Sequence, residues 1–313
     1  KLKEMPMRMR ASYTFILPIF AAFACSSSSS DLGAGGDDTS SPDGGDVSVD
    51  GGIATNHDGG GSHDGGTGGG DDSGGPPLGS GSLTPGTTTL TITAASQSRS
   101  VLLHVPASVT GHMLPLVIAL HGDGDTNTNF VNVTTTLQAK SDADGFVLAA
   151  PQGITRDVVV GTQTIQSIDW DPYNNTPTNI DLPLLDMIRT QLVATGSIDT
   201  KNISVYGYSQ GGFMSFRYGM VASASLSCAA VLAAGDPYGG GNPTEVTGAA
   251  RKIPVSIQVG TNDSLLGTAQ SAKMLLMSNG NPLDYHEISG AGHVPVPGDF
   301  TVPLDYCRGQ HLP

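Results

Sequence analysis

Three continuous apolar runs constrain the fold of this chain most strongly. They are Leu114–Leu120, Phe146–Ala150 and Ala229–Ala234. Runs of this length are typical of strands that are buried on both faces. Between them, Asp181–Ala194 has apolar residues at helical spacing. Strands that alternate with helices predict the α/β class, with a mostly parallel sheet and helices on both faces.

The remaining elements extend this alternation. An exposed hairpin is expected over Thr88–Thr93 and Ser98–Pro106. Further strands are expected at 203–206, 255–259 and 283–288, and further helices at 129–144, 211–221 and 269–277. Residues 157–178 have no clear period, so irregular chain is expected there. Sites in such sheets lie at the carboxyl ends of the strands, so the functional residues are expected just after strands.

The composition changes sharply near residue 86. Residues 26–85 are almost entirely Gly, Ser, Asp, Thr and Pro, with ten aspartates and no Lys or Arg. So few apolar residues cannot offset the entropy of ordering, and a disordered linker is expected. Asp-Gly-Gly recurs in this stretch, but calcium-binding repeats would need regularly spaced large apolar residues, which it lacks. Residues 86–313 are therefore predicted to form one folded catalytic domain.

Residues 1–25 have the pattern of an export signal. Four basic residues precede the apolar run Ala11–Ala24, which is shorter than a typical membrane span. The run ends at Cys25 and is similar to a bacterial lipobox, although Ala22 and Phe23 depart from that pattern. We expect lipidation of Cys25 and attachment to the cell envelope, periplasmic or on the cell surface. Simple cleavage and secretion is the alternative.

The net charge bears on which partners the chain can bind. The formal net charge is −14, and residues 86–313, with ten Lys or Arg and seventeen Asp or Glu, carry about half of that charge. No basic cluster favours binding to nucleic acid.

With Cys25 lipidated, Cys228 and Cys307 remain, and an exported protein can join them in a disulfide. Residues 123–129 alternate like a calcium loop but lack its glycine and glutamate, so no metal is expected.

The strongest chemical signal is Gly207–Gly212, which reads Gly-Tyr-Ser-Gln-Gly-Gly. It lies between a predicted strand and a predicted helix, the context in which G-x-S-x-G forms a nucleophile elbow. A sharp turn then presents Ser209 at a helix N-terminus, where amide groups favour developing negative charge. Ser209 is the candidate nucleophile, and a glycine-rich structural turn is the alternative.

A nucleophilic serine needs a base, and in this kind of site the acid and then the histidine follow it in the chain. Three histidines follow Ser209, of which His286 lies within the predicted strand at 283–288. His293 lies in a small-residue loop after the last predicted strand, whereas His311 lies three positions from the last residue printed. His293 is therefore the candidate base.

The acid is expected after the preceding strand. Asp263 follows the strand at 255–259 and is the first candidate. Asp236, after the strand Ala229–Ala234, is its competitor, and Asp284 is a more distant one. The acid would accept the second imidazole N–H and stabilise the imidazolium.

An oxyanion hole requires two backbone donors. The N–H of Gln210 is the first candidate, because it follows the nucleophile. The second is the N–H of Asp123, in the loop after Leu114–Leu120. The Asp123 carboxylate would have to point away from the oxyanion. His121 is expected to be structural.

Together these residues resemble the bacterial polyhydroxybutyrate depolymerase and feruloyl esterase group, similar to carbohydrate esterases of family one. The resemblance spans about residues 89–297 and rests on His121-Gly122, Trp170, Asp181, Gly207–Gly212 and Gly292–Pro295. It implies an α/β-hydrolase fold and no metal or organic cofactor. It also implies a triad of Ser209, Asp263 and His293. Trp170 and Tyr208 are the candidate substrate-pocket residues.

The expected function is that of an exported serine esterase. The substrates would be feruloyl or acetyl esters of polysaccharides, or polyhydroxyalkanoate-type polyesters. Three alternatives stay open: a carboxylesterase, thioesterase or cutinase-like lipid ester hydrolase, a serine peptidase on the same fold, and a non-catalytic surface binding protein. The expected partner is the ester substrate, which can be polymeric, and the chain is expected to act as a monomer.

Overall fold

The computed structural model describes residues 83–107, 112–160, 162–175, 178–238, 244–293 and 301–313. The expected signal, the lipidation site Cys25 and the linker up to residue 82 lie outside these ranges. The first strand begins at Gly86. Among the described residues, no helix has the length and apolar character needed to cross a bilayer.

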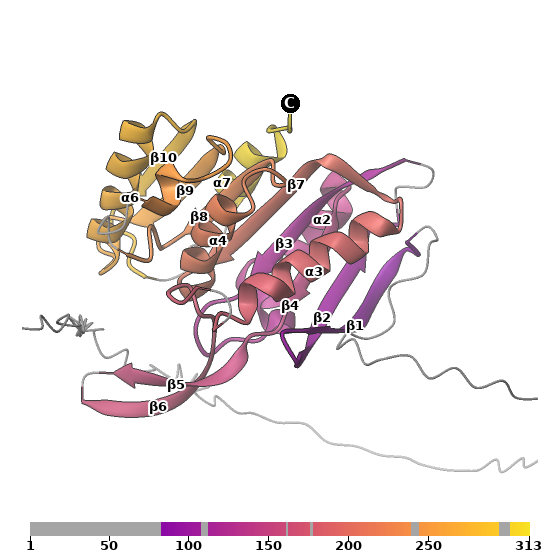
Figure 1. Ribbon diagram of the computed structural model, residues 1–313, viewed down its shortest axis with the longest axis horizontal. Coiled ribbons are helices and arrows are strands. Elements are labelled where there is room, and N and C mark those ends of the chain that lie inside the picture. Colours follow the sequence, from indigo (N-terminus) through magenta and orange to yellow (C-terminus); the bar gives the residue numbers. More distant parts are fainter. Residues whose placement is uncertain (1–82, 108–111, 161, 176–177, 239–243, 294–300) are drawn as a thin grey trace, which may run out of the picture. The chain divides into compact units, whose positions relative to one another are not determined.

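Eight strands form one mixed sheet in the order β1-β2-β4-β3-β7-β8-β9-β10 (Figure 1). Their bounds are β1 Gly86–Ala94, β2 Gln97–Val105, β3 Leu114–Leu120, β4 Val147–Pro151, β7 Ile198–Tyr208, β8 Cys228–Leu232, β9 Val255–Gly260 and β10 Leu283–Ile288. Strand β2 is antiparallel to both β1 and β4, and the other pairs are parallel. The expected α/β-hydrolase architecture is confirmed by this mostly parallel sheet.

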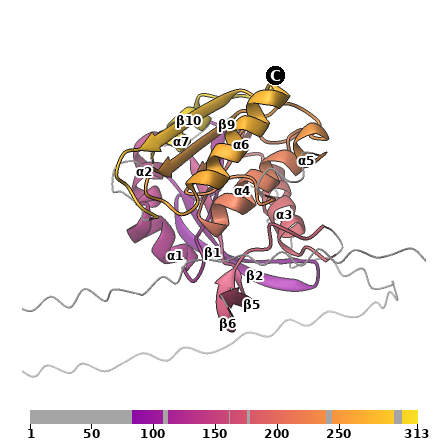
Figure 2. The same ribbon diagram turned by 90° about the vertical axis from the view of Figure 1, so that its left-hand side faces the viewer.

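Helices cover both faces of the sheet, as Figure 2 shows from the side. Their bounds are α1 Asn127–Asn129, α2 Leu137–Asp144, α3 Asp181–Ala194, α4 Gln210–Val221, α5 Thr244–Thr247, α6 Leu266–Asn279 and α7 Thr301–Arg308. Helices α3, α4 and α6 share one apolar core with the sheet, and α2 and α7 share the other. In β3, Leu116 and Ile118 face the first core and Val117 and Ala119 the second, which explains the continuous apolar run.

The segment expected to be irregular contains a hairpin. Strands β5 (Ile154–Val160) and β6 (Gln163–Asp169) pair antiparallel and form a separate two-stranded sheet. Figure 1 shows this hairpin projecting beyond the large sheet. The expectation was wrong here, because both segments are rich in β-branched residues, which favour strands.

The helix expected over residues 129–144 is broken. A short α1 continues into a π-helical turn over Phe130–Thr134, and α2 begins only at Leu137. Between them Thr136 has a φ of 54°, which no helix tolerates. The consecutive threonines at 134–136 have low helix propensity, which explains the break.

Cys228 and Cys307 form a disulfide, with their Cα atoms 5.2 Å apart. It joins the first residue of β8 to α7, a helix that the sequence pattern did not predict. Leu304 is fully buried in α7, and Arg308 donates a hydrogen bond to Asp144 over 2.5 Å. The segment is therefore held by packing and an ion pair in addition to the disulfide.

Candidate active site

The turn between β7 and α4 holds Ser209 in an unusual conformation. Its φ of 54° and ψ of −119° lie in a region that glycine favours. A Cβ atom at Gly207 would overlap the carbonyl oxygen of Gly211, and one at Gly211 would overlap that of Leu120. Glycine at both positions therefore lets the turn pack directly against the end of β3.

A continuous hydrogen-bonded path starts at this serine. The Oγ of Ser209 lies 2.8 Å from Nε2 of His293. Nδ1 of His293 lies 2.9 Å from each carboxylate oxygen of Asp263. The Asp263 side chain is fully buried. The structure thus brings together the predicted nucleophile, base and acid, from the ends of β7, β10 and β9.

The competing residues lie elsewhere. Asp236 accepts a hydrogen bond from the backbone N–H of Tyr238. Asp284 lies in β10 and contacts Ser256 and His286. His311 is exposed near the C-terminus. Their described contacts lie apart from the Ser209–His293 pair.

Tyr208 supports the histidine loop. Its hydroxyl donates a hydrogen bond to the carbonyl oxygen of His293 over 2.9 Å, and its ring stacks on the imidazole with centroids 5.4 Å apart. Burial raises the pKa of Tyr208, so the hydroxyl keeps the proton that it donates. Tyr208 was expected in the substrate pocket, and these contacts give it a role in positioning His293.

The loop after β3 lies beside the serine. A Cβ atom at Gly122 would lie 3.5 Å from the Cβ of Ser209. The N–H of Gly124 donates to the carbonyl oxygen of Ile168 in β6 over 2.9 Å. The hydroxyl of Ser167, also in β6, donates to the Asp123 carboxylate. This contact holds the Asp123 carboxylate against the hairpin. An oxyanion role for the Asp123 amide requires such a contact, because the carboxylate must point away from the oxyanion.

His121 fixes the orientation of the same loop. Its Nε2 accepts the backbone N–H of Gly153 over 2.9 Å, so the ring proton is on Nδ1, which donates to the carbonyl oxygen of Gly122 over 2.7 Å. Burial lowers the pKa of His121, which favours this neutral form. Because C=O and N–H point in opposite directions across a trans peptide, fixing the Gly122 oxygen also fixes the direction of the Asp123 N–H.

Trp170 does not line an accessible pocket, and this expectation was wrong. Its side chain is only 1% exposed and belongs to the apolar core. The indole N–H donates to the carbonyl oxygen of His121 over 2.9 Å, and the Trp170 carbonyl accepts from the Gln210 side chain over 3.3 Å. Trp170 therefore supports the loops on both sides of the serine from within the protein.

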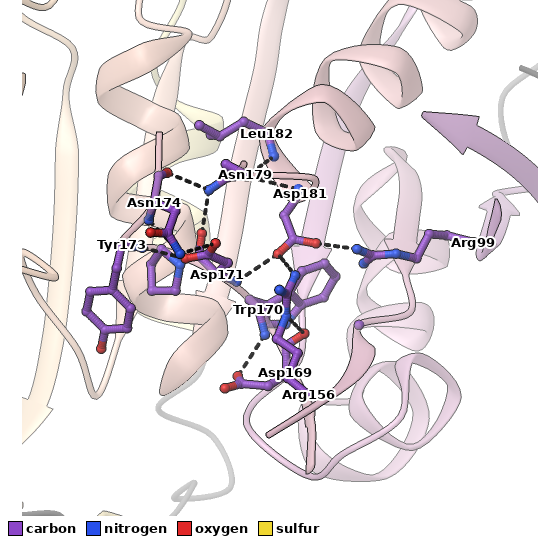
Figure 3. Close-up of polar contacts among 12 residues, drawn as sticks. Arg99, Arg156, Asp169, Trp170, Asp171, Tyr173, Asn174, Asn179, Asp181 and Leu182 are labelled. Carbon is purple, nitrogen blue, oxygen red and sulfur yellow. Dashed lines mark hydrogen bonds and ion pairs between the residues drawn. The ribbon is translucent and has the colours of Figure 1, made fainter. Parts of the chain in front are cut away.

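Asp181, at the start of α3, is the centre of a buried polar network (Figure 3). Its carboxylate accepts hydrogen bonds from Arg99 over 2.5 Å, from Arg156 over 2.7 Å and from the backbone N–H of Asp171 over 2.7 Å. These donors compensate the buried negative charge. The network connects β2, the β5–β6 hairpin and the segment after β6.

Asp169 and Tyr173 also lie near the site, and the sequence analysis did not single them out. Asp169 is 6% exposed, and burial raises its pKa to about 7. The ring of Tyr173 is exposed, and its hydroxyl hydrogen-bonds with the side chain of Gln210. No motif marks these residues, although Asp169 ends β6 and Tyr173 follows it, where functional side chains are expected.

Within the described ranges, no group of three or more His, Cys, Asp or Glu side chains could hold a metal ion. What the arrangement offers chemically is a serine hydroxyl bonded to an imidazole that a buried carboxylate orients. The amides of Gln210 and Asp123 lie in the two segments that flank the serine.

Comparison with known proteins identifies a family and related folds. The sequence profile of a family described as phospholipase/carboxylesterase matches residues 108–300. The bifunctional acetylxylan esterase/xylanase XynS20E of Neocallimastix patriciarum is 27% identical over 172 residues, which make up 55% of this chain. The chain covers 22% of that relative's length.

Solved structures share the fold at low sequence identity. A ferulic acid esterase superposes with a TM-score of 0.55 at 14% identity, covering 71% of this chain and 96% of the other. An S-formylglutathione hydrolase from Staphylococcus aureus gives a TM-score of 0.52 at 12% identity, covering 66% and 92%.

Proposed function

Since this chain belongs to the phospholipase/carboxylesterase family and is by class a carboxylic ester hydrolase, we propose that it cleaves esters through an acyl-enzyme formed on Ser209. The observation that carries the proposal is the unbroken path from Ser209 through His293 to Asp263. Each group in it has the chemistry that its place requires: nucleophile, base and buried anion.

In this mechanism, Nε2 of His293 removes the hydroxyl proton as Ser209 attacks the ester carbonyl. Asp263 accepts the N–H on Nδ1 and stabilises the imidazolium. The amides of Gln210 and Asp123 stabilise the oxyanion. The alcohol leaves with the proton from Nε2, and a water molecule, deprotonated by the same nitrogen, hydrolyses the acyl-enzyme.

For the substrate, we propose acetyl or feruloyl esters on a polysaccharide. The sequence match to an acetylxylan esterase/xylanase supports this class. The resemblance to polyhydroxybutyrate depolymerases makes a polyester the substrate to compare with it.

We also propose that the protein is exported and carries lipid on Cys25. The apolar run before Cys25 supports this, and so does the Cys228–Cys307 disulfide, since disulfides persist in oxidising compartments. Metabolic labelling with a fatty-acid analogue tests it. Label in the wild type and none in Cys25→Ser is the expected result.

The enzymatic proposal is tested with p-nitrophenyl acetate, p-nitrophenyl butyrate and methyl ferulate. We expect Ser209→Ala and His293→Ala each to lower kcat by about 10⁴-fold or more while the circular dichroism spectrum stays unchanged. His311→Ala is the matched control and should behave as wild type. Turnover near wild type in either triad variant would overturn the mechanism.

A further inference from the structure

The segment after β6 is held unusually firmly for a loop (Figure 3). The carboxylate of Asp171 accepts the backbone N–H groups of Tyr173 and Asn174, each over 3.0 Å. The amide of Asn179 donates to the carbonyl oxygens of Asp171, over 2.6 Å, and Asn174, over 2.9 Å. These bonds join the described residues 171–175 to Asn179 and fix the backbone at Tyr173 and Asn174.

A second set of contacts ties the same turn to the rest of the protein. The buried Arg217 of α4 donates to the carbonyl oxygen of Pro172 over 2.7 Å and to the Asn175 side chain over 2.5 Å. The hydroxyl of Tyr238 donates to the carbonyl oxygen of Tyr173 over 2.8 Å. The position of the Tyr173 backbone is thus fixed from three sides.

Two side chains lie at the edge of this network, Asp169 at the end of β6 and Tyr173 in the segment after it. Figure 3 shows the Tyr173 ring projecting away from the hydrogen-bonded residues, and Tyr173 is 40% exposed. Asp169 uses Oδ1 to accept the backbone N–H of Trp170 over 2.7 Å. Among the described residues, no donor reaches its Oδ2. That carboxyl oxygen is therefore available to a ligand, although the residue is more than nine-tenths buried.

Both side chains adjoin the proposed oxyanion hole. The Tyr173 hydroxyl hydrogen-bonds with the side chain of Gln210, whose backbone N–H is one proposed oxyanion donor. Asp169 and Ser167 are two residues apart in β6 and so lie on one face of the strand. Ser167 bonds to Asp123, the residue of the second proposed donor. A substrate group that extends from the oxyanion hole toward the end of β6 would approach Asp169 and Tyr173.

An exposed aromatic ring and a carboxyl oxygen without a donor, both in the region of the proposed oxyanion hole, are suited to a particular ligand chemistry. The ring offers an apolar face, and the carboxyl group bonds a hydroxyl. We propose that Asp169 and Tyr173 form a subsite that binds a hydroxylated sugar ring in the alcohol part of the ester. This rests on the esterase function proposed above. A polyester offers no such hydroxyl groups along its chain, so the carboxyl group would be left unpaired.

The test uses the full-length enzyme and two acetyl esters, acetylated xylotriose and p-nitrophenyl acetate. Both give the same acetyl-enzyme, so the ratio of their kcat/KM values reports on the alcohol part alone. We expect Asp169→Ala and Tyr173→Ala each to lower this ratio by about 10-fold or more, chiefly through KM for the sugar ester. Asp169→Asn, which keeps a hydrogen-bonding group, should lower it less.

Asp157→Asn is the matched control. Asp157 is an exposed carboxylate of the same hairpin, and it lies on the face opposite to that of Asp169 and Arg156. It should leave the ratio unchanged. Xylotriose without acetyl groups should inhibit p-nitrophenyl acetate hydrolysis competitively, with a higher inhibition constant in Asp169→Ala. This second measurement needs only that the variant still turns over the small ester.

A ratio that stays at the wild-type value in both alanine variants would overturn the sugar subsite. So would a wild-type enzyme that cleaves p-nitrophenyl acetate and polyester but not acetylated xylotriose, and in that case the esterase mechanism would stand. A wild-type enzyme inactive on every ester would instead remove the esterase proposal, and the subsite with it.

Discussion

Both carboxylate oxygens of Asp263 lie 2.9 Å from Nδ1 of His293. The carboxylate is held in place in turn, because its Oδ1 also accepts the backbone N–H of Leu265 over 2.8 Å. The loop after β9 therefore determines which imidazole nitrogen carries the proton, and it leaves Nε2 facing Ser209.

Asp263→Asn is expected to lower kcat by about 10³- to 10⁴-fold, because the amide cannot hold the same tautomer or stabilise the imidazolium. Steady-state kinetics on p-nitrophenyl acetate measure this. Asp236→Asn is the matched control, since Asp236 is also a buried aspartate after a strand, and it should cost less than about 10-fold. If the two results were exchanged, Asp236 would be the acid.

His121→Gln should lower kcat by about 10- to 100-fold with little change in KM, because it frees the peptide between Gly122 and Asp123 that directs one oxyanion donor. Burst kinetics with p-nitrophenyl butyrate separate the acylation step from deacylation, and both should slow. A variant with wild-type kcat at an unchanged melting temperature would show that the loop keeps its orientation without His121.

Removing the disulfide should destabilise the protein by about 4 kcal/mol, the chain-entropy value for a loop of 79 residues. For a domain of this size that corresponds to roughly 10 °C in Tm. Calorimetry measures this loss of stability. It compares the Cys228→Ala/Cys307→Ala double variant with the wild type under reducing and under oxidising conditions. Two free thiols in natively exported protein would contradict the bond itself.

Asp169 should make the folded state less stable as the pH rises. Its pKa is raised to about 7 from an ordinary 3.8, so between these values the folded protein holds a proton that the unfolded chain releases. Stability is then lost from about pH 4 to pH 7, by up to about 4 kcal/mol. The groups that act on it are Asp123, Arg156 and Asp181, besides the N–H of Trp170.

Asp169→Asn stays neutral throughout, so its Tm relative to wild type should be higher at pH 8 than at pH 5. Differential scanning fluorimetry across this range is sufficient. A difference in Tm that does not change with pH would mean that Asp169 is ionised at pH 5 in the folded protein.

The positions of Ser209, Asp263 and His293 could be predicted from the sequence, because each depends on the order of strands, turns and helices along the chain. The elbow at Ser209 needs only a strand, a turn and a helix in succession. His293 and Asp263 then follow from the strands before them. The apolar runs predicted the central strands for a similar reason, since burial on both faces leaves a direct trace in composition.

The surroundings of the triad could not be predicted, because they depend on contacts between distant parts of the chain. Arg99 and Asp181 are 82 residues apart, and Ser167 and Asp123 are 44 apart. The β5–β6 hairpin is anchored through such pairs, and a two-stranded sheet alone is only marginally stable. Trp170 was placed in the pocket from resemblance, whereas its indole N–H bonds to a carbonyl inside the core.

The backbone of Ser209 has a consequence for how this protein evolves. A φ of 54° with a ψ of −119° costs about 1–3 kcal/mol for a residue with a side chain and little for glycine. Selection for thermal stability alone would therefore replace Ser209 with glycine. Serine persists at this position only while the reaction contributes to fitness, so a descendant lineage that no longer needs the activity should accumulate glycine here before other parts of the fold change.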